Sequence, residues 1–228
     1  MSDTVTLKID GQEVSVPAGT TILEAAQQIG TVIPVICYHP HLTANGLCRV
    51  CSVDTGGRVQ AAACVTECAQ GMNVVTRGEK VERGRRTILE LLASTVNLAE
   101  APDILKLLEE YASDPNRFAG GRRRESPIHD DNPFYIRDYN QCINCWRCVQ
   151  VCAEDAQFAY ALNFDGRGFS TTIGTFQGDG MLDTTCVFCG QCVGACPTGA
   201  LKPKREALLE QGMDPDEIFF ATRMRKKK

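Results

Sequence analysis

Two short runs of cysteine are the residues of this sequence best suited to chemistry. Cys142–Cys152 reads C-I-N-C-W-R-C-V-Q-V-C and Cys186–Pro197 reads C-V-F-C-G-Q-C-V-G-A-C-P, so both runs have the spacing C-x2-C-x2-C-x3-C. In such a run, the first three thiolates lie on a tight loop and bind irons of one cluster, whereas the fourth ligates the neighbouring cluster. Two copies in the same register predict a pair of [4Fe–4S] clusters.

The crossing of the fourth cysteine defines two sets of predicted ligands. The first set combines three cysteines of the first run with the last of the second run: Cys142, Cys145, Cys148 and Cys196. The second set is the converse: Cys186, Cys189, Cys192 and Cys152. Zinc is the alternative, because C-x2-C pairs are its commonest signature, but a zinc ribbon does not require the third and fourth cysteines or the proline that ends the second run.

A third set of cysteines lies nearer the N-terminus. Its members are spaced C-x10-C-x2-C-x12-C: Cys37, Cys48, Cys51 and Cys64. Four thiolates with only one close pair suit a [2Fe–2S] cluster that is wrapped by a loop. A Rieske site is disfavoured, because Cys37-Tyr38-His39 offers one half of its motif but no C-x2-H follows.

Cys68 remains when the other twelve cysteines have been assigned. It could replace Cys64 as the fourth [2Fe–2S] ligand. A spare thiol in the loop after the site is the preferred interpretation.

The elements that must position these thiols divide the chain into three predicted domains, residues 1–78, 79–124 and 125–228. In the first, apolar residues alternate on both sides of Asp10-Gly11, which predicts a β-hairpin, and Thr20 or Thr21 is expected to cap a helix that Gly30 ends. A last strand is expected at 72–76. The class is therefore α+β.

The other two domains have their own patterns. In residues 79–124 a helix rich in Arg and Glu is expected to precede a second helix, which follows Pro102 and has apolar residues at i, i+3, i+4 and i+7 from Ile104. Residues 119–125 form a predicted linker. In the third domain, Leu162–Leu182 is expected to form a hairpin or loop over the clusters, and the chain ends in a basic tail from Arg223.

Composition and charge restrict the cellular compartment and the class of function that fit this chain. The chain has 228 residues, 13 of them cysteine, and a formal net charge of −4. No apolar signal segment occupies residues 1–10 and no apolar run is long enough to insert into a membrane, which predicts a reducing compartment, the cytoplasm, where clustered cysteines bind metals. The negative net charge argues against a nucleic-acid partner. Without a nucleotide-binding G-x-G-x-x-G or a nucleophile–base set, no catalytic residue is expected on this chain.

The sequence resembles a known family over nearly its whole length. It is similar to the small iron–sulfur subunit of the diaphorase module in NAD-reducing [NiFe] hydrogenases. It also resembles the N-terminal regions of the complex I large iron–sulfur subunit, of [FeFe] hydrogenases and of NAD-dependent formate dehydrogenases. The matching residues are I-P-V-I-C-Y-H-P (Ile33–Pro40), G-L-C-R-V-C-S-V (Gly46–Val53), A-C-V-T (Ala63–Thr66), N-P-F-Y-I-R-D-Y-N-Q-C-I-N-C-W-R-C-V (Asn132–Val149), the second cysteine run and F-F-A-T-R (Phe219–Arg223).

The resemblance implies a fold and a role. Residues 1–78 would be a β-grasp, plant-type ferredoxin domain with a [2Fe–2S] cluster on Cys37, Cys48, Cys51 and Cys64, residues 79–124 a helical connector, and residues 125–228 a bacterial-type two-[4Fe–4S] ferredoxin domain. The chain would relay single electrons between a flavoprotein subunit that binds FMN and NAD(H) and a catalytic hydrogenase, formate dehydrogenase or other reductase. The alternative is a free polyferredoxin that diffuses between enzymes.

One departure from the family pattern concerns the connector. Relatives usually carry a His and three Cys there, which bind a further [4Fe–4S] cluster. Residues 97–124 contain neither cysteine nor histidine. The expected complement is therefore one [2Fe–2S] and two [4Fe–4S] clusters, three clusters rather than four.

Overall fold

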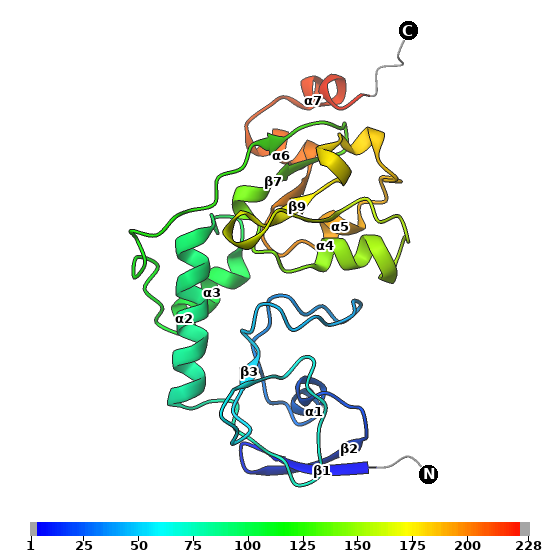
Figure 1. Ribbon diagram of the computed structural model, residues 1–228. Helices are drawn as coiled ribbons and strands as arrows, with labels where there is room; N and C mark the ends of the chain where they lie inside the picture. The colour runs from blue at the N-terminus through cyan, green and yellow to red at the C-terminus, as the bar shows by residue number, and fades with distance from the viewer. Residues whose placement is uncertain (1–3, 224–228) are drawn as a thin grey trace. The chain divides into compact units, whose positions relative to one another are not determined.

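The chain folds into two compact units of α+β structure. The structure, a computed structural model, describes residues 4–223. Unit 1 comprises Met1–Ser94 and Asp103–Gly121, and unit 2 comprises Thr95–Pro102 and Arg122–Lys228 (Figure 1). Nearly all of the basic tail expected from the sequence lies outside the described residues.

The sheet of unit 1 is built on the expected hairpin. Strand β1 (Thr4–Ile9) pairs antiparallel with β2 (Gln12–Pro17), and β5 (Asn73–Val74) joins the other edge of β1 in parallel. The turn uses Asp10 and Gly11, both at positive φ, which is the conformation that matches the twist of a two-residue hairpin. The strand predicted at 72–76 is present but spans only two residues.

Helix α1 (Ile22–Gln28) packs its apolar residues into the core of unit 1. Its first turn is closed by a capping box, in which Thr21 accepts from the backbone N–H of Glu24 and the Glu24 side chain accepts from that of Thr21. The small sheet of β3 (Ser52–Val53) and β4 (Ala61–Ala62) contributes to the same core, as do Cys51 and Cys64. Two of the four thiols predicted to bind a [2Fe–2S] cluster are therefore part of a packed core.

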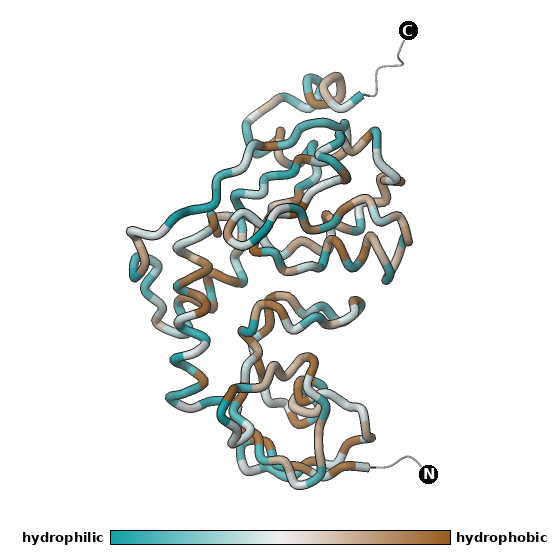
Figure 2. Tube along the Cα trace, in the orientation of Figure 1, coloured by the Kyte–Doolittle hydropathy of each residue, from teal (hydrophilic) through white to brown (hydrophobic). Residues whose placement is uncertain are grey.

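Two helices complete unit 1, α2 (Glu79–Thr95) and α3 (Pro102–Glu110). The trace of α2 alternates between hydrophilic and hydrophobic residues (Figure 2), as expected for a helix with one buried face. Its most deeply buried polar residue is Arg85, which is 1% exposed. Arg85 donates from Nε to the carbonyl of Val50 (3.0 Å), and from its two terminal nitrogens to the carbonyl of Ser52 (3.0 Å) and the hydroxyl of Tyr111 (2.9 Å). Arg85 thus fixes the backbone on both sides of Cys51.

Unit 2 contains a three-stranded antiparallel sheet and a separate hairpin. The sheet has the order β10 (Leu201–Pro203), β7 (Tyr135–Asp138), β6 (Ile128–His129). The first cysteine run leaves β7 and enters α4 (Arg147–Gln150), and the second run enters α5 (Gln191–Gly194) and leads to β10. Between the runs, β8 (Asn163–Asp165) and β9 (Thr172–Gly174) pair antiparallel, which confirms the hairpin expected within Leu162–Leu182.

The C-terminal part of unit 2 is helical, with α6 (Lys204–Glu210) and α7 (Pro215–Ala221). Short single turns link the other elements: 3-10 turns at Tyr139–Gln141, Gly168–Ser170, Phe176–Gly178 and Met181–Asp183, and a π-helical turn at Val151–Asp155. In residues 4–223, none of the helices has both the length and the apolar composition of a membrane span.

Candidate iron–sulfur cluster sites

The two cysteine runs of unit 2 adopt the same backbone conformation. Asn144 and Phe188, which occupy the same place in their runs, have φ values of 54° and 53°. Trp146 and Gly190, two residues further on, have φ values of 73° and 74°. Positive φ is sterically unfavourable for a tryptophan and free for glycine, so the first run accepts strain to form the loop that the second forms without it.

This loop aims backbone donors at the first thiol of each run. The N–H of Asn144 donates to Sγ of Cys142 (3.4 Å), and the N–H of Phe188 donates to Sγ of Cys186 (3.3 Å). Hydrogen bonds of this kind favour the thiolate form, which is the form that binds metal. The internal repeat of the sequence is thus reproduced in the geometry of the loops.

The thiols of the first predicted set line one cavity. Its walls carry Cys142, Cys145, Cys148 and Cys196, together with Tyr139, Trp146 and Ile173. Burial raises the pKa of Cys145 to about 12 and that of Cys148 well above its usual value, and the neighbouring thiols, Cys196 included, raise both further. Three buried thiols and the half-buried Cys196, which must lose their protons together, fit a polynuclear cation, since a positive core would offset their mutual repulsion.

The second predicted set lines another cavity of unit 2. Its walls carry Cys152, Cys186, Cys189 and Cys192, with apolar side chains that include Leu162 and Met181 from the segment between the runs. Burial raises the pKa of Cys192 to about 12, and the charges of Cys152, Cys186 and Cys189 act in the same direction. The structure therefore brings the fourth cysteine of each run to the other run's first three.

Tyr135 of β7 is a member of this second site that the sequence did not reveal. Its hydroxyl lies 3.1 Å from Sγ of Cys186, a residue 51 positions away. Burial, and then the contact with Cys186, raises the pKa of Tyr135, so the hydroxyl stays protonated and can donate to the thiolate. No local sequence pattern predicts this contact between Tyr135 and Cys186, because it depends on how β7 packs against the second cysteine run.

A Tyr135→Phe substitution should lower the reduction potential of one [4Fe–4S] cluster by about 40 mV. The reason is that a hydrogen bond to a ligand sulfur, worth about 1 kcal/mol, stabilises the more negative reduced state. An EPR-monitored redox titration measures the shift. Tyr160→Phe is the matched control, since Tyr160 is 59% exposed. Equal potentials for both variants and the unmodified chain would contradict a tuning role for Tyr135.

In unit 1, the four thiols predicted to bind a [2Fe–2S] cluster form two close pairs. The N–H of Cys37 donates to Sγ of Cys48 (3.5 Å), and the N–H of Cys48 donates to Sγ of Cys37 (3.4 Å). The Sγ atoms of Cys51 and Cys64 lie 3.4 Å apart. Hydrogen bonding with the partner thiol lowers the pKa of Cys48 to about 6 and that of Cys51 to about 7. The hydrogen bond with Cys51, then burial, and the charges of the other three thiols, Cys51, Cys37 and Cys48, all raise the pKa of Cys64.

Cys68 lies apart from this group of charges. It is buried in the core of unit 1, where its N–H donates to the carbonyl of Thr20 (2.8 Å). Burial raises its pKa, followed by the charge of Glu24, and none of the four other thiols of unit 1 contributes. Because Sγ of Cys64 lies 3.4 Å from Sγ of Cys51, and no such contact is found for Cys68 within residues 4–223, Cys64 is favoured over Cys68 as the fourth ligand.

Cys64→Ser should abolish the [2Fe–2S] signal, whereas Cys68→Ser should leave it intact. The physical reason is that only Cys64 shares its surroundings with Cys37, Cys48 and Cys51. The spectrum of the reduced protein, recorded by EPR, distinguishes the two variants. The opposite pattern, with the signal lost only on substitution of Cys68, would exchange the two assignments.

Among the described residues, no group of three or more His, Cys, Asp or Glu side chains is arranged to hold a single metal ion.

Comparisons with known proteins agree with the division of the thiols between the two units. Residues 2–79 match the family model of the 2Fe-2S iron-sulfur cluster binding domain, and residues 141–200 match that of the 4Fe-4S dicluster domain. A solved structure, the NAD+-reducing [NiFe]-hydrogenase in the H2-reduced state, contains a chain that superposes with a TM-score of 0.77 at 29% identity, over 88% of this chain and 87% of that one.

Curated relatives extend the comparison. The NADP-reducing hydrogenase subunit HndD of Solidesulfovibrio fructosivorans is 35% identical over 95% of this chain and 39% of its own length. An NADH-quinone oxidoreductase chain of Rhizobium meliloti (strain 1021) is 33% identical over 86% of this chain and 24% of its own length. The chain thus spans well under half of either relative. The chain is thus an iron–sulfur protein in which a 2Fe-2S iron-sulfur cluster binding domain is followed by a 4Fe-4S dicluster domain, and it is similar to subunits of an NADP-reducing hydrogenase and an NADH-quinone oxidoreductase and to a chain of an NAD+-reducing [NiFe]-hydrogenase.

Proposed function

We propose that this chain is the electron-relay subunit of an NAD(P)-linked oxidoreductase complex, with one [2Fe–2S] and two [4Fe–4S] clusters. The observation that carries the proposal is the pair of cavities in unit 2, each lined by three thiols of one run and the fourth thiol of the other. Bound clusters would accept and release single electrons. The proposed ligands are the three sets named above, in which Cys64 completes the [2Fe–2S] set.

The protein's own residues would hold and insulate these centres. Cysteine side chains supply the thiolates, and the N–H groups of Asn144 and Phe188 stabilise their charge. Trp146 lies half-buried on the wall of the first cavity, with its ring edge-on to Phe164 at a centroid distance of 4.9 Å. Such packing excludes water from the site and holds the reduction potential at a defined value.

A relay of this kind needs partners at both ends. A nicotinamide delivers a hydride, two electrons at once, whereas an iron–sulfur cluster accepts one, and a flavin is the usual device that separates them. The proposed partners are therefore a flavoprotein subunit that binds FMN and NAD(H) and a catalytic hydrogenase, formate dehydrogenase or other reductase. The proposed location is the cytoplasm.

Anaerobic purification from the native cell, followed by iron and sulfide analysis, tests this proposal. We expect about ten irons per chain, from one [2Fe–2S] and two [4Fe–4S] clusters, and co-purification with a flavin-containing subunit. About fourteen irons would mean a fourth cluster, and stoichiometric zinc without sulfide would refute the cluster assignment. A stable monomer with three clusters and no companions would instead identify the free polyferredoxin.

A further inference from the structure

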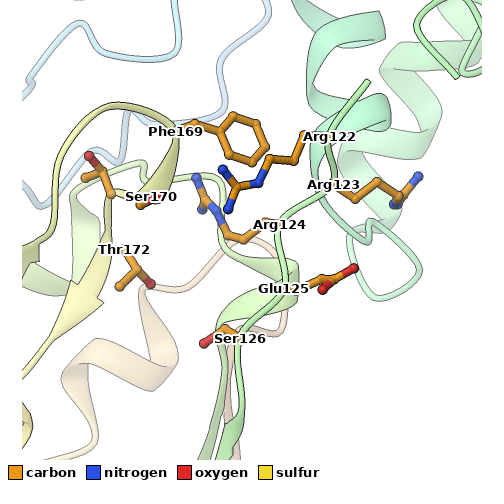
Figure 3. A pocket seen from close by; sticks show the side chains of 9 residues that line it. Arg122, Arg123, Arg124, Glu125, Ser126, Phe169, Ser170 and Thr172 are labelled. Carbon is orange, nitrogen blue, oxygen red and sulfur yellow. The ribbon is translucent and has the colours of Figure 1, made fainter. Parts of the chain in front are cut away.

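A basic pocket in unit 2 lies outside the proposed cluster sites. It has a volume of about 450 Å3 and opens between the connecting segment Arg122–Ser126 and residues Phe169–Thr172 of the β8–β9 hairpin (Figure 3). None of the twelve proposed ligand thiols lines it. The electron-relay function does not by itself account for this pocket.

Two arginines converge on the pocket. The guanidinium groups of Arg122 and Arg124 lie beside each other on the side of Phe169, whereas Arg123 points away from them (Figure 3). The Arg122 guanidinium lies over the Phe169 ring, 5.2 Å from its centroid. Neither Arg122 nor Arg124 forms an ion pair with any carboxylate among residues 4–223. Two neighbouring cations without a counter-ion repel each other. An anion bound between them would replace this repulsion with two attractive interactions.

Two residues that line the pocket also carry a buried polar atom that lacks a partner. Arg124 donates from one terminal nitrogen to the carbonyl of Cys142 and to Oδ1 of Asn144 (3.3 Å), but its Nε is buried with no hydrogen-bond partner. The hydroxyl of Thr172, which lines the pocket, is likewise buried without a partner. A buried polar group without a hydrogen-bond partner is unfavourable, so a small shift of either side chain toward a ligand that accepts hydrogen bonds would be favourable.

The donor set defines the chemistry of that ligand. The pocket offers two guanidinium groups and the hydroxyls of Ser170 and Thr172, all of which can donate, and a phosphate group has enough oxygen acceptors for several of them at once. Arginine is the side chain that binds phosphate in a forked geometry. The volume is within the range of about 300–1,000 Å3 that small-molecule sites occupy. We propose that this pocket binds the phosphate group of a small-molecule ligand.

Binding in the pocket would act on the first [4Fe–4S] site, a consequence that rests on the proposed function. Arg124 connects the two places, because it lines the pocket and donates to the carbonyl of Cys142. A phosphate on Arg124 would offset the positive charge beside Cys142 and make an added electron there less favourable. By linkage, the reduced protein would bind phosphate more weakly than the oxidised protein.

Titration of the full-length chain with inorganic phosphate and with pyrophosphate, followed by calorimetry at constant ionic strength, tests the site. We expect saturable binding that chloride does not reproduce. Arg122→Gln should weaken it about tenfold or more, since a hydrogen bond to a charged group is worth about 1.5–3 kcal/mol. Thr172→Val should weaken binding severalfold without lowering Tm, because it removes a hydroxyl that has no partner in the ligand-free protein.

Arg58→Gln is the matched control, since it removes the same charge from an exposed position of unit 1. It should leave phosphate affinity unchanged. The absence of saturable binding, or an equal loss in the Arg58→Gln and Arg122→Gln variants, would overturn the site and reduce the effect to general charge attraction.

A redox titration tests the second claim, that phosphate in the pocket changes the reduction potential of a cluster, separately from the existence of the site. A phosphate concentration that just saturates the unmodified chain should lower the midpoint potential of one [4Fe–4S] signal there, and should lower it less in Arg122→Gln. A tenfold weaker affinity of the reduced form corresponds to a shift of 59 mV. Saturable binding with an unchanged potential would overturn the coupling and leave the site in place. Saturable binding to a chain that carries no iron would leave the site in place and refute the proposed function.

Discussion

Substitution of Cys196 by alanine, in the second run, is expected to remove the [4Fe–4S] cluster that the first run holds. The iron content should fall from about ten to about six per chain, since a complete cubane is lost with one ligand. The reason is spatial: Cys196 lines the cavity of Cys142, Cys145 and Cys148, and it is absent from the cavity of Cys186, Cys189 and Cys192. Iron analysis and EPR of the reduced variant measure the loss.

Double variants test directly whether each cluster takes its fourth ligand from the other run. Cys142→Ala with Cys196→Ala should lose no more iron than either single variant, because both residues serve one cluster. Cys142→Ala with Cys152→Ala should lose both [4Fe–4S] clusters, although the two residues belong to the same run. Cys68→Ser, which affects a buried thiol outside all three sets, controls for general damage. If clusters were lost run by run instead, the crossed assignment would be wrong.

Arg85→Met is expected to destabilise unit 1 by about 3 kcal/mol or more and to make the [2Fe–2S] cluster labile. The variant would leave the carbonyls of Val50 and Ser52 without their donor in a buried region, and each hydrogen bond to a charged group is worth about 1.5–3 kcal/mol. Because these carbonyls flank Cys51, the loop should lose its fixed geometry first. Thermal unfolding and the rate of loss of the [2Fe–2S] absorbance are the measurements.

Arg83→Met is the matched control for this effect. Arg83 lies on the same helix, but its side chain is 70% exposed, so its removal should change stability by less than about 1 kcal/mol. Arg85→Lys retains the charge but lacks the forked donor, and it should fall between the two. Equal stability and equal cluster lifetime in the Arg83 and Arg85 variants would contradict a role for Arg85 in holding the cluster loop.

Local sequence patterns were sufficient for much of the fold. The alternation around Asp10-Gly11 predicted the β1–β2 hairpin, because a period of two and a turn residue with accessible positive φ are local properties. Thr21 was one of the two residues expected to cap α1, and it forms the capping box with Glu24. The strand expected at 72–76 is shorter than predicted, since only Asn73 and Val74 reach the edge of β1. The three-domain division at 78 and 124 remains a prediction.

The sequence by itself determined that this protein carries thiols spaced for iron–sulfur clusters, because the spacing of ligands on one tight loop is a short-range property of the chain. It also predicted the exchange of fourth ligands, which remains a proposal until the variants are measured. Only the tertiary structure decided which distant side chains surround the thiols: Tyr135 beside Cys186, and Arg85 beneath the loop of Cys51. It also placed Arg124 between a pocket and Cys142. Such contacts follow from the packing of strands and helices far apart in sequence, and no local pattern encodes them.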